Sequence, residues 1–351
     1  MAILRSEAVQ ESAATLRDAA SSRLKAPVFV VGSARSGTNF LYDTLLSSGG
    51  FAVYRTEPVV FDILLPKFGD LSKRRNREKL LAVWFKSYQF RLSRLDRGLI
   101  EEKILHDCHN AGDFLTIVMD ELARQQGLER WAAWGPDNLL YMPLIARTVP
   151  GSVFLHIIRD GRDVALSMNK KRFIRPFPWD RQRSLLVAAL HWRWKVERGR
   201  AAGRDIPNRY MEIRFEDLVG RRTREVLEQI GRFIGYDLDY ERIQRAAIGT
   251  VARPNSTFEG ADGMPTSEPV GRWKSFLSRA QVEQVESILG PLLEDFGYPL
   301  EFPGAVTRGL AAKFMRASYP AFFDLKEWLK MQTPFGRFVN INRLQFNAIP
   351  K

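Results

Sequence analysis

The sequence VFVVGSARSGTNFL occupies residues 28–41 and sets the fold class. Its first four residues are β-branched or aromatic, which predicts a short buried strand that ends at Gly32. A helix is expected to begin near Ser36, because the apolar residues that follow share one face: Phe40, Leu41, Leu45 and Leu46. A helix that starts after a glycine-rich turn presents N–H groups and a partial positive charge. The segment therefore predicts a binding site for an anion.

The loop has the G-x-x-x-x-G spacing of a Walker A loop but lacks the lysine of that motif. Thr38 stands where the lysine would follow Gly37, and Arg35 places a cation inside the loop instead. ATPases and kinases need that lysine on the β- and γ-phosphates and a hydroxyl on Mg²⁺. The sequence therefore predicts a nucleotide without a γ-phosphate and no metal. The alternative is a tight structural turn with a solvent-facing arginine.

Two further pairs of a strand and a helix follow along the chain. Residues 153–158 predict a second buried strand, with a helix from about Asp163 to Lys170. Residues 211–215 predict a third strand, with a helix over 223–234. Buried strands that alternate with helices are typical of a parallel sheet covered on both faces. The predicted fold class is α/β: a single P-loop-like domain with a central parallel sheet flanked by helices.

The segment GSARSGTNFLYDTL at residues 32–45 resembles the 5′-phosphosulfate loop of the sulfotransferase superfamily. It is most similar to the arginine-loop branch, which includes tyrosylprotein and many bacterial sulfotransferases. The resemblance implies that 3′-phosphoadenosine 5′-phosphosulfate (PAPS) is the co-substrate. It also implies which residues bind the 5′-phosphate and sulfate: Arg35, Ser36, Gly37, Thr38 and Asn39. Phe40 falls where some relatives place a tryptophan that stacks on adenine.

A second motif, RDGRDVALS at residues 159–167, follows the strand that ends at Ile158. An arginine at the carboxyl end of a parallel strand lies where open α/β sheets bind ligands. The spacing resembles the family's 3′-phosphate motif, which implies that Arg159 and Ser167 hold the 3′-phosphate. The alternative, a structural ion-pair turn, stays open for three neighbours: Asp160, Arg162 and Asp163.

Other segments resemble the family in the same order, and the resemblance covers about residues 26–300. They are residues 211–219, residues 270–274, and a helix that begins with a capping box at Ser278 and ends at Gly297. We therefore expect an N-terminal arm at 1–25, a sulfotransferase domain at 26–302, and a helical, basic and aromatic C-terminal extension at 303–351.

Glu57 is the candidate general base, because the acceptor hydroxyl must lose a proton as the new bond forms. Arginine-loop relatives carry a catalytic glutamate at a similar distance from the loop. Arg35 is the candidate for stabilising charge on the leaving 5′-phosphate. One alternative is that Glu57 is a surface residue paired with Arg55, and another is a histidine base, His106 or His109. His156 and His191 are expected to pack in the interior.

The sequence departs from the family at WAAWGPDN, residues 131–138. Relatives often read Trp-Gly-Asp-Lys-Thr-Pro here, and their lysine stabilises the transferring group. Aligned on Pro136, the chain has Trp134 in place of that lysine. Either the catalysis is weaker or altered, or another cation substitutes: Lys170, Lys171 or Arg172.

The net charge of +13, from 53 Lys and Arg against 40 Asp and Glu, is compatible with an anionic partner. A nucleic-acid partner is not expected, since no zinc spacing or RNA-recognition signature accompanies that charge. A single cysteine, Cys108, fits a reducing compartment. The N-terminal residues lack an apolar signal-like core, and no run is long enough to span a bilayer. A cytoplasmic location is therefore expected.

The C-terminal extension mixes basic and aromatic residues, among them Arg308, Lys313, Phe314, Tyr319, Phe323, Trp328 and Phe338. Such a mixture in short helices suits docking on an anionic membrane surface. The alternative is that the aromatic residues pack on the domain or on a second subunit.

Together these features predict a sulfotransferase that moves a sulfuryl group from PAPS to a hydroxyl of a carbohydrate, glycolipid or small molecule. The alternative is a catalytically altered nucleotide-binding module of the same fold. The sequence leaves the acceptor and the oligomeric state open.

Overall fold

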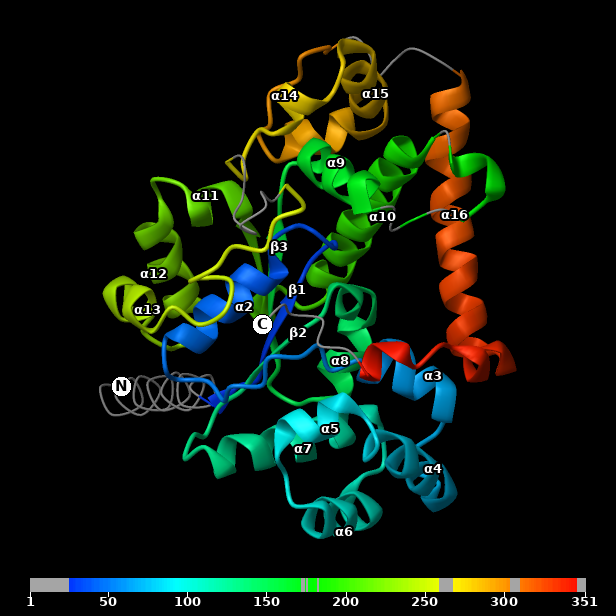
Figure 1. Ribbon diagram of the computed structural model, residues 1–351. Helices are drawn as coiled ribbons and strands as arrows, with labels where there is room; N and C mark the ends of the chain where they lie inside the picture. The colour runs from blue at the N-terminus through cyan, green and yellow to red at the C-terminus, as the bar shows by residue number, and fades with distance from the viewer. Residues whose placement is uncertain are drawn as a thin grey trace, which may run out of the picture.

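The computed structural model describes residues 25–171, 174, 176–181, 183–258, 268–303 and 310–345. Four strands form one parallel sheet in the order β2-β1-β3-β4, which lies in the middle of the molecule (Figure 1). They are β1 Val28–Val31, β2 Ala132–Trp134, β3 Val153–Ile158 and β4 Tyr210–Arg214. The α/β class and the three predicted strands are confirmed. Strand β2 was not predicted, because three residues are too few for a periodic pattern.

One face of the sheet packs against helices from the first half of the chain. Phe29 and Val31 of β1 and Phe154 of β3 join a buried cluster with Phe114 and Leu115. The elements that cover this face are η1 Val60–Leu64, α3 Leu65–Phe68, α4 Arg74–Trp84, α5 Tyr88–Ser93, α6 Arg97–Asp107, α7 Ala111–Gln125, η2 Pro136–Tyr141 and α8 Met142–Thr148. Because side chains alternate along a strand, Val28 and Val30 point to the opposite face.

The opposite face is covered by the helix that follows the phosphate loop. This helix, α2 (Thr38–Ser47), begins two residues after the expected Ser36 and buries Leu41 and Leu45 against the sheet. Beside it lie α11 Phe215–Val219, α12 Thr223–Ile234 and α13 Tyr240–Ala246. Helix α12 has the predicted bounds and ends at Gly235, whose φ of 70° is left-handed.

A third buried cluster joins the end of β3 to helices from later in the chain. It is formed mainly by α9 Gly161–Lys171, α10 Ser184–Arg204, α15 Arg279–Asp295 and α16 Leu310–Gln332. Helix α15 begins with the predicted capping box at Ser278, and Gly297 follows its end with a φ of 70°. Short elements complete the chain: η3 Pro178–Arg181, η4 Pro207–Arg209, α14 Trp273–Phe276, η6 Pro334–Phe338 and η7 Asn342–Leu344.

The C-terminal helix α16 runs along α10 at the edge of the molecule (Figure 1). Tyr319 and Phe323 are buried there, and Trp194 Nε1 donates to Asp324 Oδ1 at 2.8 Å. Packing on the domain is thus confirmed for these aromatic residues, whereas four others are exposed: Phe314, Trp328, Phe335 and Phe338. Arg308 and most of the N-terminal arm lie outside the described residues. None of the described helices is long and apolar enough to cross a membrane.

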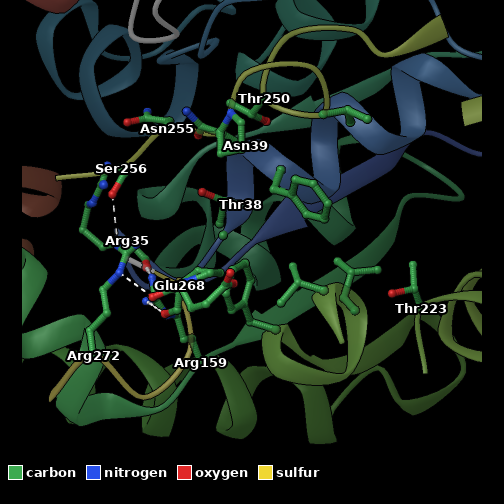
Figure 2. Close-up of a pocket in the computed structure, with 18 of the residues that line it drawn as sticks. Arg35, Thr38, Asn39, Arg159, Thr223, Thr250, Asn255, Ser256, Glu268 and Arg272 are labelled. Carbon is green, nitrogen blue, oxygen red and sulfur yellow. Dashed lines mark hydrogen bonds between the residues drawn. The ribbon is translucent and has the colours of Figure 1, made fainter. Parts of the chain in front are cut away.

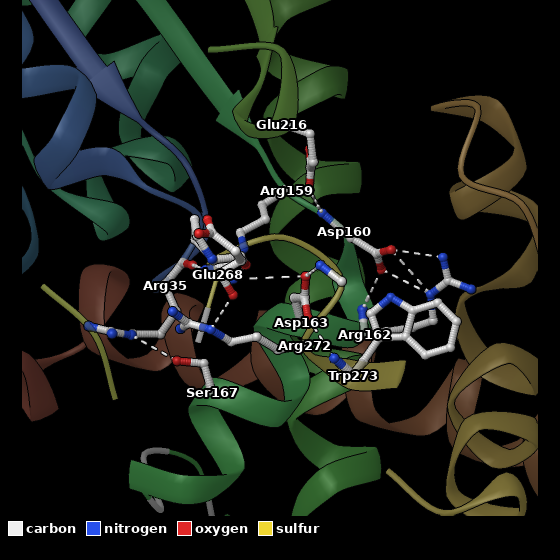
Figure 3. A network of polar contacts seen from close by, with 12 residues as sticks. Arg35, Arg159, Asp160, Arg162, Asp163, Ser167, Glu216, Glu268, Arg272 and Trp273 are labelled. Carbon is white, nitrogen blue, oxygen red and sulfur yellow. Dashed lines mark hydrogen bonds and ion pairs between the residues drawn. The ribbon is translucent and has the colours of Figure 1, made fainter. Parts of the chain in front are cut away.

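Arg162 is a fully buried cation that ties the start of α9 to α15. Its guanidinium pairs with Asp160 Oδ2 at 2.8 Å and with Glu286 Oε1 at 2.6 Å, and donates to Pro299 O at 2.9 Å. It also lies 3.8 Å from the centre of the Trp273 ring. The ion-pair turn left open by the sequence is therefore present at Asp160 and Arg162 (Figure 3).

Replacing Arg162 by alanine is expected to lower the free energy of unfolding by about 3–5 kcal/mol. The substitution leaves two buried carboxylates without their cation, and that penalty is larger than the net value of the pairs. Denaturant unfolding measures it. As a control, Arg74→Ala removes an exposed pair with Glu78 at 3.0 Å and should change stability by no more than about 0.5 kcal/mol. Equal effects of the two substitutions would contradict the structural role of the buried pair.

Candidate active site

The phosphate loop is pressed so closely against its neighbours that two positions leave no room for a side chain. A Cβ at Gly32 would lie 2.5 Å from the Ile157 carbonyl oxygen, and one at Gly37 would lie 2.4 Å from the Phe215 ring. Gly37 also has a φ of 102°, and Arg35 adopts a left-handed φ of 69°. A non-glycine residue in that region is uncommon, and strained positions of this kind cluster at functional sites.

The loop opens onto the first turn of α2, as the sequence predicted. The first N–H groups of a helix have no partner within the helix, so they are available to an anion. Ser33 and Ser36 are both buried, and among the described residues neither hydroxyl has a hydrogen-bond partner. A loop of this kind binds phosphate or sulfate through its amide and hydroxyl groups.

A cavity of about 700 Å³ lies against the loop and has the size of a nucleotide site. Six of the predicted binding residues line it: Arg35, Gly37, Thr38, Asn39, Phe40 and Arg159. The rest of the lining comes from α11 to α13, from residues 250–256, and from the segment around Pro269. Figure 2 shows three arginines at one end of the cavity, Arg35, Arg159 and Arg272, and Thr223 at the other.

The two predicted phosphate motifs meet at the arginine end. Arg35 Nε donates to Ser167 Oγ at 3.1 Å, and Arg159 Nη1 donates to the Arg35 carbonyl oxygen at 3.1 Å (Figure 3). Arg159 also lies over the Phe215 ring, 4.9 Å from its centre, and contacts the Pro269 carbonyl oxygen. The structure thus brings together Arg35, Arg159 and Ser167, which are up to 132 residues apart in sequence.

The segment after Glu268 covers the cavity and is held by buried polar contacts. Asp163 accepts from the backbone N–H groups of Gly271 at 2.8 Å and Trp273 at 2.9 Å. Asp163 also lies 3.9 Å from Arg159 Nη2, so it belongs to the ion-pair turn that the sequence left open and accepts two backbone N–H groups as well. Arg272 donates to Ser256 Oγ at 3.1 Å and lines the cavity.

Arg272 was missed as a site residue, although it lies in the GRWK segment that resembles the family. The available signal was a basic residue inside that segment, between Gly271 and Trp273. Burial lowers the pKa of Arg272, and the nearby positive charge of Arg159 lowers it further. Guanidinium groups that repel one another in this way favour an anionic ligand between them.

Glu57 lies at the same edge of the sheet but does not line the cavity. It is buried, and one carboxylate oxygen lies 3.2 Å from where a Cβ would stand at Gly135, the residue after β2. Its partner is Arg343 of the C-terminal extension, whereas Arg55 pairs with Asp43 at 3.4 Å. The alternative of a surface glutamate paired with Arg55 is therefore wrong.

The protonation of Glu57 is set by opposing effects. Burial raises its pKa most, Arg343 lowers it, and the neighbouring carboxylates Asp62 and Asp137 raise it, so that together they bring the pKa of Glu57 to about 7. A carboxyl group that titrates near neutral pH can accept a proton effectively at that pH.

The four histidines lie away from the arginine end of the cavity. His106 is exposed and contacts Asp107 at 2.6 Å, and His109 is exposed beyond the end of α6. Figure 1 shows α6 at the opposite end of the molecule from α9 and α11. His156 bonds to Tyr210 Oη at 2.6 Å inside the sheet, and His191 packs between Trp194 and Phe323. Burial lowers the pKa of both to about 3, so the predicted packing roles are confirmed.

Trp134, which replaces the family lysine, is buried in β2 with its ring 6.2 Å from that of Tyr42. Lys195 of α10 lies beside this segment: its Nζ donates to Asp137 Oδ1 at 2.6 Å and to Pro136 O at 3.2 Å. Lys170 lies 4.0 Å from the centre of the Phe258 ring, and Lys171 is exposed. Arg172 lies outside the described residues.

Comparison with protein families identifies the chain. The model of the Sulfotransferase family matches residues 27–240, which is more than half of the chain. The chain belongs to the sulfotransferase family. A sequence search among curated proteins found no match to this sulfotransferase.

Solved structures share the fold of this sulfotransferase. The sulfotransferase domain of the Synechococcus PCC 7002 olefin synthase is 18% identical, with a TM-score of 0.50, over 78% of this chain and 95% of that domain. Sulfotransferase STF9 from Mycobacterium avium is 15% identical, with a TM-score of 0.42, over 78% of each chain. At 18% identity, the similarity to the olefin synthase domain supports the fold and nothing more specific.

Gly37→Ala is expected to weaken anion binding by this sulfotransferase roughly tenfold or more, because the Cβ cannot fit beside Phe215 without moving the loop. Calorimetry with inorganic pyrophosphate measures the loss. Gly151→Ala is the matched control: Gly151 has a similar left-handed φ of 73° with nothing within 4 Å of a Cβ. It should cost about 1–2 kcal/mol of stability and leave binding unchanged. Wild-type binding by Gly37→Ala would show that the loop is not the anion site.

Proposed function

We propose that the protein transfers a sulfuryl group from PAPS to a hydroxyl acceptor. The observation that carries this proposal is the meeting of Arg35, Arg159 and Ser167 beside the first turn of α2, where both arginines line a nucleotide-sized cavity and Ser167 bonds to Arg35. Two anion-binding positions in one cavity suit a nucleotide with phosphates at both the 5′ and 3′ positions. A nucleoside triphosphate would instead need the Walker A lysine on its β- and γ-phosphates, and Thr38 stands at the position of that lysine.

In this proposal each of the two motifs binds a different phosphate group of the donor. Arg35 and the amides of Ser36, Gly37, Thr38 and Asn39 hold the 5′-phosphate and sulfate, and Arg159 and Ser167 hold the 3′-phosphate. Phe40, which lines the cavity, offers its ring to the adenine. Arg272 adds a third cation at the arginine end.

Transfer is an in-line displacement at sulfur. The acceptor oxygen forms a bond to sulfur, the bond between sulfur and the 5′-phosphate oxygen breaks, and that oxygen keeps the electron pair. Arg35 stabilises the negative charge on the leaving phosphate, and its role is electrostatic because arginine keeps its proton at neutral pH. Preorganised charges of this kind supply much of the catalysis in related transfers.

Glu57 is the proposed acceptor of the proton that leaves the hydroxyl. It lies beside Gly135, and the Gly135 N–H donates to the Val30 carbonyl oxygen at 3.3 Å, near the end of the strand that leads into the phosphate loop. The base and the loop therefore share one edge of the sheet. Its pKa of about 7 fits the exchange of a proton near neutral pH.

The acceptor is proposed to be a carbohydrate, glycolipid or small molecule, in the cytoplasm, without a nucleic-acid partner. Contact of the C-terminal extension with a membrane surface remains a hypothesis, supported by the exposure of Phe314 and Phe338. Among the described residues, no group of three or more His, Cys, Asp or Glu is arranged to hold a metal ion.

A second candidate is a nucleotide-binding module of the same fold without transfer activity. The burial of Trp134 at the position of the family lysine favours it. Turnover with labelled donor distinguishes the two candidates, since the module would bind the nucleotide without consuming it.

Adenosine 3′,5′-bisphosphate, the donor product, is expected to stabilise the protein more than AMP or ATP does, and Mg²⁺ should make no difference. At about 100 times its dissociation constant such a ligand adds about 2.7 kcal/mol of stability. Thermal shift measures the differences. Arg159→Ala should make the three nucleotides equivalent, whereas the exposed Arg232→Ala should behave as the wild type. Greatest protection by ATP with Mg²⁺ would overturn the proposed donor.

Glu57→Gln is expected to keep binding of the donor product and to lose turnover by about 10²–10⁴-fold, because the amide cannot accept the proton. Initial rates with labelled donor and a panel of hydroxyl acceptors measure it. The exposed His106→Ala serves as the control and should retain activity. An active Glu57→Gln with an inactive His106→Ala or His109→Ala would assign the base to a histidine.

A further inference from the structure

One arginine from the C-terminal extension reaches three carboxylates at the edge of the sheet. Arg343 Nη1 lies 2.6 Å from Asp62 Oδ2 and 3.2 Å from Asp137 Oδ2, and its Nη2 pairs with Glu57. Glu57 and Arg343 are 286 residues apart in sequence. Arg343 also lies outside the segment 27–240 that matches the family model. The partner of the proposed base thus comes from a part of the chain that the family match does not include.

The segment that carries Arg343 is anchored on both sides of that residue. Leu344 is fully buried in the cluster that includes Phe29 and Phe154. Lys67 Nζ donates to the carbonyl oxygens of Arg337 at 3.0 Å and Val339 at 3.2 Å. These contacts hold the backbone of the segment independently of the Arg343 side chain, which is 39% exposed.

The carboxylates of this cluster are not equivalent. Asp137 has a second cation, Lys195 at 2.6 Å, and the attraction of Lys195 and Arg343 outweighs its burial and holds its pKa far below the usual range. Burial raises the pKa of Asp62 despite Arg343. Glu57 has Arg343 as its ion-pair partner among the described residues. Arg343 is therefore the cation whose loss would most affect the charge of Glu57.

We propose that Arg343 is a positioning residue for the reaction, holding the Glu57 carboxylate oriented and charged so that it can accept the acceptor's proton. This inference rests on the proposed function of Glu57. Under this proposal the C-terminal extension contributes a residue to the active site, although no described residue of the extension lines the donor cavity.

The groups that face Glu57 determine in which direction its pKa would change without Arg343. They are Arg343 from η7, Asp62 from η1, Asp137 from η2 and, through the two aspartates, Lys195 from α10 and Lys330 from α16. Gln89 of α5 donates to the backbone carbonyl oxygen of Glu57 at 2.7 Å and so does not act on its carboxylate. Without Arg343, burial and two carboxylates would all favour neutral Glu57. The pKa would rise above about 7, and less of the base would be available at neutral pH.

The first experiment compares pH profiles of kcat/KM for the wild type, Arg343→Gln and Arg343→Lys in the full chain. Arg343→Gln should move the acidic limb up by about one pH unit or more, which is a roughly fivefold loss at pH 7 and a roughly tenfold loss below pH 6, recovered at higher pH. Arg343→Lys keeps the charge and should keep the wild-type limb. Binding of adenosine 3′,5′-bisphosphate should be unchanged in both. Arg337→Gln is the matched control, because Arg337 lies in the same segment with its side chain exposed.

A loss in Arg343→Gln that is equal at every pH would overturn the inference, since it would indicate a structural role. If Arg343→Gln does not fold, Arg343→Lys decides: a wild-type limb supports the role of the charge, and a uniform loss overturns it. Normal turnover by Glu57→Gln would instead refute the proposed base, so the two failures are distinguishable.

A second readout does not depend on activity. Glutamate labelled with ¹³C at Cδ gives a carboxyl resonance for Glu57, which is assigned by its absence in Glu57→Gln. Its titration midpoint should lie about one pH unit or more higher in Arg343→Gln than in the wild type. An unchanged midpoint would overturn the inference whatever the rates show.

Discussion

The turn from β1 into α2 is the constraint on which the site depends. The chain passes from a buried strand into a helix with no space for a side chain at Gly32, beside the Ile157 carbonyl, or at Gly37, beside the Phe215 ring. This close approach presses the loop onto β3 and α11, and it places Arg35 in a left-handed conformation. The arginine then lies next to Ser167 and Arg159, which come from the end of the neighbouring strand and its helix. The packing of the sheet thus brings the two halves of the proposed anion site together.

The polar contacts around the cavity serve mainly to hold cations in place. Asp163 fixes the covering segment through two backbone N–H groups, and the buried pairing of Arg162 with Asp160 stabilises the turn directly after Arg159. Arg272 then stands near Arg159, and burial together with repulsion between the two guanidinium groups lowers the pKa of Arg272. A protein can maintain such an arrangement because the surrounding contacts compensate for the repulsion. A bound anion would relieve the repulsion, which is why the arrangement suits a doubly phosphorylated nucleotide.

The C-terminal extension connects the stability of the fold to the chemistry proposed for the site. Helix α16 packs on α10 through Tyr319 and Phe323, and the following segment is anchored by the burial of Leu344. The same segment carries Arg343 to the acidic side chains at the edge of the sheet. Changes in the extension can therefore reach Glu57 without altering the donor cavity.

The sequence by itself determined the parallel α/β fold and the turn from the first strand into its helix, and it predicted anion-binding roles for that loop and for Arg159 and Ser167. These features are encoded by short-range periodicity and by spacings within a few turns, so they can be recognised before packing is known. Only the tertiary structure decided that Trp134 is buried, that Arg272 lines the cavity and that Glu57 pairs with Arg343. Ion pairs between distant segments depend on how the helices pack. Until that packing is known, any of the many arginines in this sequence could be the partner of a given carboxylate.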